Sequence, residues 1–262
     1  MAVHYRTQGF VLKKNDLREA DQVFSIYTQD FGKLKILGKA IRKIKSKLRA
    51  GAELFYLSEI EFIQGKTYKT LTDAIVIDKF KNIRRDLEKL EITYQVAEVS
   101  DNLIRGEERD DKIWDLLSEV FDKLKIEKQP SGEAASRPAK ATLRGVRFAS
   151  SKILYYYFLW NLLSILGYQI DLYNCAVCQK KLVPQKLCFN SEEGIICSEC
   201  SGNLKDKSEI SPDIIKILRL FFGKNWNILS RLKIQDSYKK ELENISENYL
   251  QTYCEVIFRR EI

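Results

Sequence analysis

Residues 33–49 read KLKILGKAIRKIKSKLR, a stretch that joins a strand pattern to a dense run of positive charge. Its first five residues alternate basic and apolar side chains, which predicts a β-strand with lysines on one face and apolar side chains on the other. The window contains no acid and eight cations, namely Lys33, Lys35, Lys39, Arg42, Lys43, Lys45, Lys47 and Arg49. The stretch therefore predicts a strand that leads into a long basic connection.

Strand patterns lie on both sides of this stretch. Apolar and β-branched residues predict strands at 5–12, 22–28, 33–37, 53–63 and 67–77, with turns at 30–32 and around 64–65. Five short strands with a long connection from the third to the fourth are typical of a closed OB-type barrel, a fold that often binds oligonucleotides. An SH3-like barrel is the alternative, because the sequence alone does not determine the strand order.

After the barrel the apolar residues recur at helical spacing. This spacing predicts a helix of about 20 residues from Asn82 and further helices at 111–124, 147–166, from Ser211 and at 237–259. The run Tyr155-Tyr156-Tyr157-Phe158 and Trp160 lie in one of these helices. Aromatic side chains in such a pattern could stack on bases, but we expect them to form core.

The predicted fold class is a multi-domain α+β protein. Residues 1–80 are expected to form the OB-type barrel, and residues 81–172 and 204–262 to form the two parts of a helical domain. Within the first part, residues 127–146 begin EKQPSGEAASRPAKAT, which predicts a flexible connection. Residues 173–203 are expected to form a zinc-ribbon-like insert with four cysteines.

Positive charge is concentrated in the predicted barrel. The 262-residue chain has a net charge of +8, and residues 1–80 hold 15 Lys and Arg against 9 Asp and Glu. Crowded cations repel one another, and a polyanion relieves that repulsion while its counterions are released. We therefore expect the eight cations of the basic stretch to contact nucleic acid. An anionic membrane, an acidic protein or a solvated loop are the alternatives.

The chain shows no pattern for export or for membrane insertion. Its first residues lack the apolar segment of a secretory signal, and no apolar run approaches the ~20 residues of a spanning helix. We expect a cytoplasmic protein, in which structural disulfides are rare.

Four of the six cysteines form two pairs, Cys175-Ala-Val-Cys178 and Cys197-Ser-Glu-Cys200, which 18 residues separate. This spacing predicts one structural Zn²⁺, whose four positions the thiolates fill without leaving room for a catalytic water. Catalytic zinc, an iron–sulfur cluster and a redox pair are the alternatives. Cys188, between the pairs, is expected to pack rather than ligate, and Cys254 to be a buried thiol.

Residue patterns of enzymes are scarce in this chain. His4 is the only histidine, and the sequence contains neither a GxxxxGK[ST] loop nor a GxGxxG motif. The acidic pairs 107–108 and 110–111 could hold metals for nuclease chemistry, but such pairs more often lie in solvated turns. We therefore predict a binding protein without catalytic residues rather than an enzyme.

Several stretches together resemble the RecO family of bacterial recombination mediators. They are TQGFVL at 7–12, EAD at 19–21, TQDFGKLK at 28–35, residues 39–47, FKNIR at 80–84, LLSILGY at 162–168, and the cysteine pairs with Glu193 and Gly194 between them. One position departs from the family pattern, because Ala40 follows Lys39 where glycine is expected. If that glycine supports a special backbone angle, the local turn should differ.

The resemblance implies an N-terminal OB-fold and a helical domain with a zinc site. It also implies binding of single- and double-stranded DNA, annealing of complementary strands, displacement of single-strand-binding protein, and gap repair. The implied partners are RecR, the acidic C-terminal tail of single-strand-binding protein and, indirectly, RecA, which suggests association with the nucleoid. Barrels and zinc ribbons also occur in RNA- or ribosome-associated adaptors, which are the alternative function.

Residue by residue, the resemblance places phosphate contacts on Lys35, Lys39, Arg42, Lys43 and Lys47, with Arg84 and Arg85 as further candidates. Tyr56 and Tyr68 could stack on bases, although most aromatic side chains of a barrel belong to its core.

Overall fold

The computed structural model describes residues 3–126, 151–184, 186–203 and 207–259. The chain divides into two compact units, residues 1–125 and 126–262, and each is described by itself. The connection predicted at 127–146 lies outside the described residues, as does the start of the helix predicted at 147–166.

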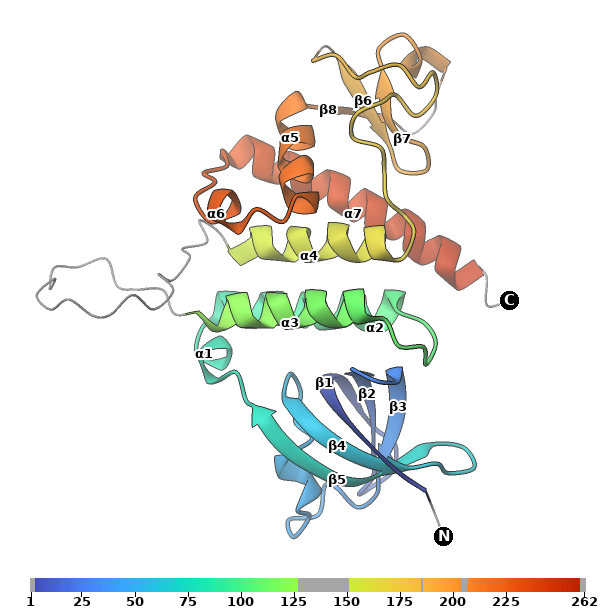
Figure 1. The fold of residues 1–262 in the computed structure, drawn as a ribbon, viewed down its shortest axis with the longest axis vertical. Helices are drawn as coiled ribbons and strands as arrows, with labels where there is room; N and C mark the ends of the chain where they lie inside the picture. The colour runs from blue at the N-terminus through green and yellow to red at the C-terminus, as the bar shows by residue number, and fades with distance from the viewer. Residues whose placement is uncertain (1–2, 127–150, 185, 204–206, 260–262) are drawn as a thin grey trace, which may run out of the picture. The chain divides into compact units, whose positions relative to one another are not determined.

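Five strands of the first unit close into a barrel in the order β1-β2-β3-β5-β4 (Figure 1). They are β1 (His4–Asp16), β2 (Gln22–Thr28), β3 (Gly32–Gly38), β4 (Leu57–Ile63) and β5 (Lys69–Asp78). Neighbours pair antiparallel except β3 and β5, whose short parallel pairing closes the barrel. This topology confirms the predicted OB-type barrel, and the basic stretch is its connection from β3 to β4.

Alternation along the strands separates the barrel core from its outer face. Leu34 and Ile36 of β3 are fully buried in the core with Phe24 and Ile26 of β2, which lie opposite them. The first strand extends beyond the predicted end at residue 12, because a bulge after Val11 lets it continue to pair with β2 as far as Asp16.

Three helices follow the barrel within the first unit: α1 (Lys81–Arg84), α2 (Leu87–Leu103) and α3 (Asp111–Lys125). The single helix predicted from Asn82 is wrong in one respect, because it is divided at Asp86. The Asp86 carboxylate accepts hydrogen bonds from the backbone N–H groups of Glu88 and Lys89, which makes it the N-cap of a new helix.

The helix α3 covers part of the outer face of β1. The ring of Phe10 lies 5.2 Å from that of Trp114 and 4.8 Å from that of Phe121. Full burial of one such ring contributes on the order of 2 kcal/mol. The barrel and its helices are therefore joined by a second apolar layer outside the barrel core.

The second unit contains α4 (Ser151–Ile165), α5 (Pro212–Phe222), α6 (Trp226–Leu229) and α7 (Asp236–Arg259). Trp160 of α4 stacks on Tyr249 of α7 at 4.7 Å and donates a 3.0 Å hydrogen bond from Nε1 to Ser246 Oγ. Tyr157 is also fully buried, with its ring 4.3 Å from that of Trp226. The prediction that this aromatic run forms core is confirmed. Ser211 caps α5 as expected, by accepting from the N–H of Ile214.

A small three-stranded sheet carries the cysteine pairs. It consists of β6 (Leu187–Asn190), β7 (Gly194–Cys197) and β8 (Lys207–Ile210), in the order β7-β6-β8. The sequence analysis does not predict β8, which adds residues beyond the expected insert at 173–203. Within the described ranges, no helix is long and apolar enough to cross a membrane.

Candidate nucleic-acid interface and four-cysteine centre

The connection between β3 and β4 is anchored on the barrel. Ile41 is 1% exposed and belongs to the barrel core, and Leu48 packs against the same core. The backbone N–H of Ala40 donates to Asp21 Oδ1 at 2.7 Å, which ties the connection to the loop between β1 and β2. The connection is therefore held near both of its ends by contacts that its own residues make with the barrel.

Between these anchors the chain forms consecutive turns. The N–H of Lys43 donates to the Ala40 carbonyl at 3.2 Å, and the N–H of Ser46 donates to the Lys43 carbonyl at 2.9 Å. Seven of the predicted contacts are exposed, namely Lys35 on β3 and Lys39, Arg42, Lys43, Lys45, Lys47 and Arg49 in the connection. Arg42 also pairs with Asp16 at 3.1 Å, but both side chains are about half exposed, so the pair contributes little.

Ala40 has the backbone angle that a glycine would favour. Its φ is 50°, in the left-handed region. An L-residue pays about 1 kcal/mol or more for that conformation. Alanine therefore stands in a conformation that favours glycine, at the position where the sequence analysis expects glycine.

A small cavity of about 270 Å³ lies beneath the basic connection, lined by Lys14, Gln22, Ile41, Arg42, Arg49, Ala52 and Glu53. Lys14 forms an ion pair with Glu53 in this cavity. Burial and the ion pair have opposite effects on the pKa of the Glu53 carboxylate. Burial alone would raise the pKa of Glu53, but the hydrogen bonds from Lys14 and from the N–H of Leu54 lower it. The sequence analysis missed Lys14, although a Lys-Lys pair directly follows the first predicted strand.

Lys33 occupies a different environment from the other predicted contacts. Its side chain is 9% exposed, and its Nζ donates a 2.5 Å hydrogen bond to the backbone carbonyl of Asp101 on α2. Burial lowers the pKa of Lys33 to about 8, and the Asp101 carboxylate opposes that shift. Asp101 in turn accepts from Ser25 Oγ at 2.6 Å and pairs with Lys13 at 3.2 Å. This geometry favours the exposed cations over Lys33 as contacts to a phosphate.

Arg84 and Arg85 are exposed at the junction between the barrel and α2. Arg84 donates to the Leu54 carbonyl, and its guanidinium lies 4.8 Å from the ring centre of Tyr56. The face of Tyr56 is thus already in contact with a cation. Tyr68, in the β4–β5 hairpin, is half-buried.

The structure brings the four predicted metal ligands together. The Sγ atoms of Cys175, Cys178, Cys197 and Cys200 all lie within 4.8 Å of one another. Cys197 ends β7, and Cys200 follows it in a turn in which its N–H donates to the Cys197 carbonyl at 3.2 Å. The Sγ atoms of Cys178 and Cys197 are 3.8 Å apart. This is too long for a disulfide and close to the ~3.8 Å edge of a tetrahedron with metal–sulfur bonds of about 2.3 Å.

Two of these thiols have pKa values that depart from the ordinary value in opposite directions. Burial alone would raise the pKa of Cys175, but the backbone N–H groups of Cys178, Cys197 and Val177 lower it to about 6. Hydrogen bonds with the neighbouring thiols of Cys197 and Cys178 raise the pKa of Cys200 instead. Four thiolates this close repel one another, and a divalent cation removes that repulsion.

The other two cysteines lie outside this cluster. Cys188 is half-buried on β6, opposite Ile196, and is not one of the four grouped sulfurs. Cys254 lies on α7 and is half-buried, where the sequence analysis expects a buried thiol.

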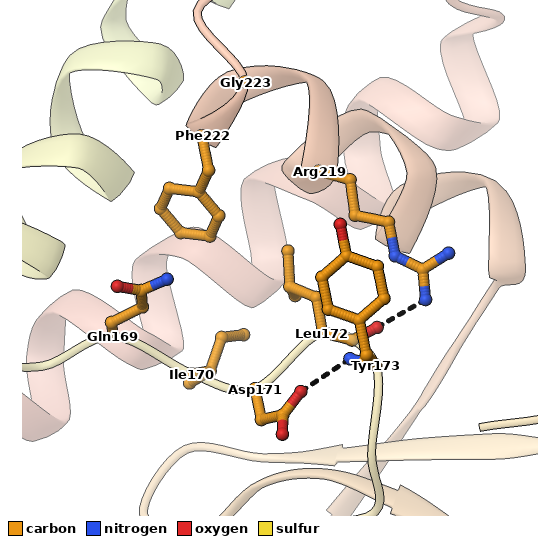
Figure 2. Close-up of a pocket in the computed structure, with 8 residues that line it drawn as sticks. All are labelled: Gln169, Ile170, Asp171, Leu172, Tyr173, Arg219, Phe222 and Gly223. Atoms are coloured by element: carbon orange, nitrogen blue, oxygen red, sulfur yellow. Dashed lines mark hydrogen bonds between the residues drawn. The ribbon is translucent and has the colours of Figure 1, made fainter. Parts of the chain in front are cut away.

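The second unit also contains a cavity of about 580 Å³ between the segment 169–173 and α5 (Figure 2). Arg219 donates to the Leu172 carbonyl at 2.5 Å, and its guanidinium lies 4.4 Å from the ring centre of Tyr173. Asp171 accepts a 2.7 Å hydrogen bond from the N–H of Tyr173. The charges of Asp171 and Arg219 balance, so the cavity does not favour an acidic ligand over a neutral one.

Comparison with known proteins matches both units. The family model described as "Recombination protein O N terminal" matches residues 1–80, and "Recombination protein O C terminal" matches residues 137–260. A DNA repair protein RecO of Dehalococcoides mccartyi is 30% identical over 240 residues, which are 91% of this chain and 86% of that protein. The chain belongs to the RecO family. A RecO of Caldanaerobacter subterraneus subsp. tengcongensis is 25% identical over 256 residues, 97% of this chain and 94% of that protein.

Membership of the RecO family confirms the resemblance seen in the sequence and supports a role in DNA repair. The anchored basic connection lies in the part matched by the N-terminal model, and the four cysteines lie in the part matched by the C-terminal model.

Proposed function

We propose that this protein is a DNA-binding recombination mediator that works without a catalytic step. It binds single- and double-stranded DNA, anneals complementary strands in gap repair, and displaces single-strand-binding protein so that RecA can load. The observation that carries the proposal is the set of seven exposed cations on and beside an anchored connection of the OB-fold.

The mechanism is electrostatic. Two DNA strands repel each other through their phosphates, and cations held between them lower that repulsion while the bases pair. Because Ile41 and Leu48 fix the connection on the barrel, its backbone need not be ordered when DNA binds, which reduces the entropic cost of binding. These contacts to phosphate position a strand without reading its sequence.

We further propose that the four cysteines hold one structural Zn²⁺. Bound there, the ion supplies a cross-link between the segment 175–178 and the end of β7. The partners proposed on family grounds are RecR and the acidic tail of single-strand-binding protein, with RecA as an indirect partner and the nucleoid as location.

The test is annealing of complementary oligonucleotides that are coated with single-strand-binding protein, measured with and without this protein across a salt series. Acceleration that fades with salt is expected. The double variant Lys43→Glu, Lys47→Glu should abolish it and flatten the salt dependence of DNA affinity. The matched control, Lys112→Glu with Lys240→Glu, makes the same change in net charge at exposed positions that are not part of the connection.

Two results would contradict the proposal. The first is an unchanged DNA affinity and salt slope in the Lys43, Lys47 variant. The second is that the protein binds RNA more tightly than DNA and does not accelerate annealing. A preference for RNA would require recognition of the 2′-hydroxyl, which DNA lacks, and would favour the RNA- or ribosome-associated adaptor.

A further inference from the structure

One apolar side chain lies in the middle of the basic connection and is almost completely exposed. Ile44 is 95% exposed, the highest value among the large apolar side chains that the structure describes. Its spacing from Ile41 and Leu48 is that of one face of a helix, which would bury all three together. Instead, the turn from Lys43 to Ser46 directs the chain so that Ile41 and Leu48 pack on the core and Ile44 does not.

The neighbours of Ile44 distinguish it from other exposed apolar residues. Leu87 is 85% exposed, but its sequence neighbours are the acids Asp86 and Glu88, which would repel a polyanion. Around Ile44 the residues Arg42, Lys43, Lys45 and Lys47 are all exposed and cationic. A polyanion drawn to these cations therefore reaches Ile44, which has no acid beside it, whereas the two acids that flank Leu87 repel one.

The chemistry of a nucleic-acid strand suits this arrangement. Phosphates recur along the strand and bases project beside them, so a cationic loop with one apolar side chain can contact both. Apolar side chains of DNA-binding proteins insert between neighbouring bases and unstack them. Ile44 lies within the turn that the Ser46 to Lys43 hydrogen bond closes, and this turn follows the one that is anchored at Ala40, so the Ile44 side chain is already presented in the free protein.

We propose that Ile44 is a base-contacting wedge, which inserts against the bases of a single strand whose phosphates lie on the surrounding cations. This inference rests on the proposed function and adds to it a contact that does not depend on charge. It makes the protein distinguish a strand with bases from a bare phosphate backbone, and it keeps the bases of the bound strand unstacked before they pair.

The experiment compares the full chain with its Ile44→Ser variant on two probes, a fluorescein-labelled dT oligonucleotide and an abasic oligonucleotide of the same length. The bound bases should partly bury the Ile44 side chain. Its loss should therefore weaken dT binding roughly five-fold at every salt concentration. The slope of log affinity against log salt and the affinity for the abasic probe should stay unchanged. Ile75→Ser is the control, because Ile75 is 51% exposed on β5 opposite the acid Glu59, and it should leave both affinities as they are.

A second variant separates this inference from the proposed function. Lys43→Gln should weaken both probes alike and reduce the salt slope by about 0.7, the value for one phosphate contact on a single strand. If Lys43→Gln behaves so while Ile44→Ser binds dT normally, or weakens both probes equally, the wedge is refuted and DNA binding stands. If the unmodified chain binds neither probe in a salt-dependent way, both proposals fail.

Discussion

Replacing Lys33 tests whether a predicted DNA contact is instead part of the contact between the barrel and α2. The Lys33 side chain is 9% exposed, and burial lowers its pKa from 10.5 to about 8 although Asp101 opposes the change. One pKa unit corresponds to about 1.4 kcal/mol, so the charged form of Lys33 costs the folded protein about 3 kcal/mol relative to the neutral form.

The sign of the pH dependence follows from proton linkage. Below pH 8 both the folded and the unfolded chain keep the Lys33 proton, and the cost is constant. Between pH 8 and 10.5 the folded chain releases a proton that the unfolded chain retains, so the free energy of unfolding rises with pH. Relative to Lys33→Met, which does not titrate, the unmodified chain should gain about 2 kcal/mol between pH 7 and pH 9.5.

Two measurements check this reasoning. Carbon-13 NMR of labelled lysine Cε should show one resonance that titrates near pH 8, absent in Lys33→Met. Asp101→Asn should move that midpoint lower still, because the carboxylate favours the charged form. Urea unfolding of both chains at the two pH values gives the stability difference. A Lys33 midpoint near that of exposed lysines, with a difference in stability that does not change with pH, would refute the argument and return Lys33 to the phosphate contacts.

Three further predictions concern the centre and the turns that hold the interface. A strong zinc chelator, or Cys178→Ser, should remove hydrogen-exchange protection from β6 and β7 while the barrel strands keep theirs. If β6 and β7 retained their protection without bound metal, the zinc centre would be contradicted. Ala40→Gly should stabilise the barrel by roughly 0.5 kcal/mol in urea unfolding, because the relief of backbone strain at φ 50° exceeds the cost of the entropy that glycine adds to the unfolded chain. The control Ala52→Gly, in the core, should destabilise the barrel. Gly51→Ala should destabilise the barrel by about 2 kcal/mol or more in the same assay, since the new Cβ would lie 1.9 Å from the Ala74 carbonyl oxygen. The control Gly202→Ala should have little effect on stability, because its new Cβ would meet no atom within 4 Å.

Features with a strong repeat or spacing were predictable from the sequence. Alternation such as Lys33-Leu34-Lys35-Ile36 specifies a face as well as a strand, and the structure buries Leu34 and Ile36 as expected. The two cysteine pairs specify a cluster because each pair turns tightly on itself, and all four sulfurs do meet.

Features that depend on a distant partner were not predictable. The pattern makes Lys33 and Lys35 equivalent on one face of β3, but only Lys33 meets Asp101, which lies 68 residues further along the chain. The strand β8 has a single buried residue, Ile210, and pairs with β6 through its backbone, so it has almost no apolar pattern. The division of the helix at Asp86 was missed for a different, local reason: it depends on a side-chain cap, which the spacing of apolar residues alone does not reveal.

The basic connection joins stability to binding, because Ile41 belongs to the barrel core and Leu48 packs against it while the cations face solvent. Ile41 contacts the core from within the stretch that carries the charges, so a change inside the barrel can move those charges without altering any of them. Large-to-small substitution of Ile41 costs about 2–5 kcal/mol in a packed core and also removes an anchor of the connection. DNA affinity should therefore fall in such a variant by more than its folded fraction explains, with the salt slope also reduced, since cations on a loosened loop neutralise fewer phosphates at once.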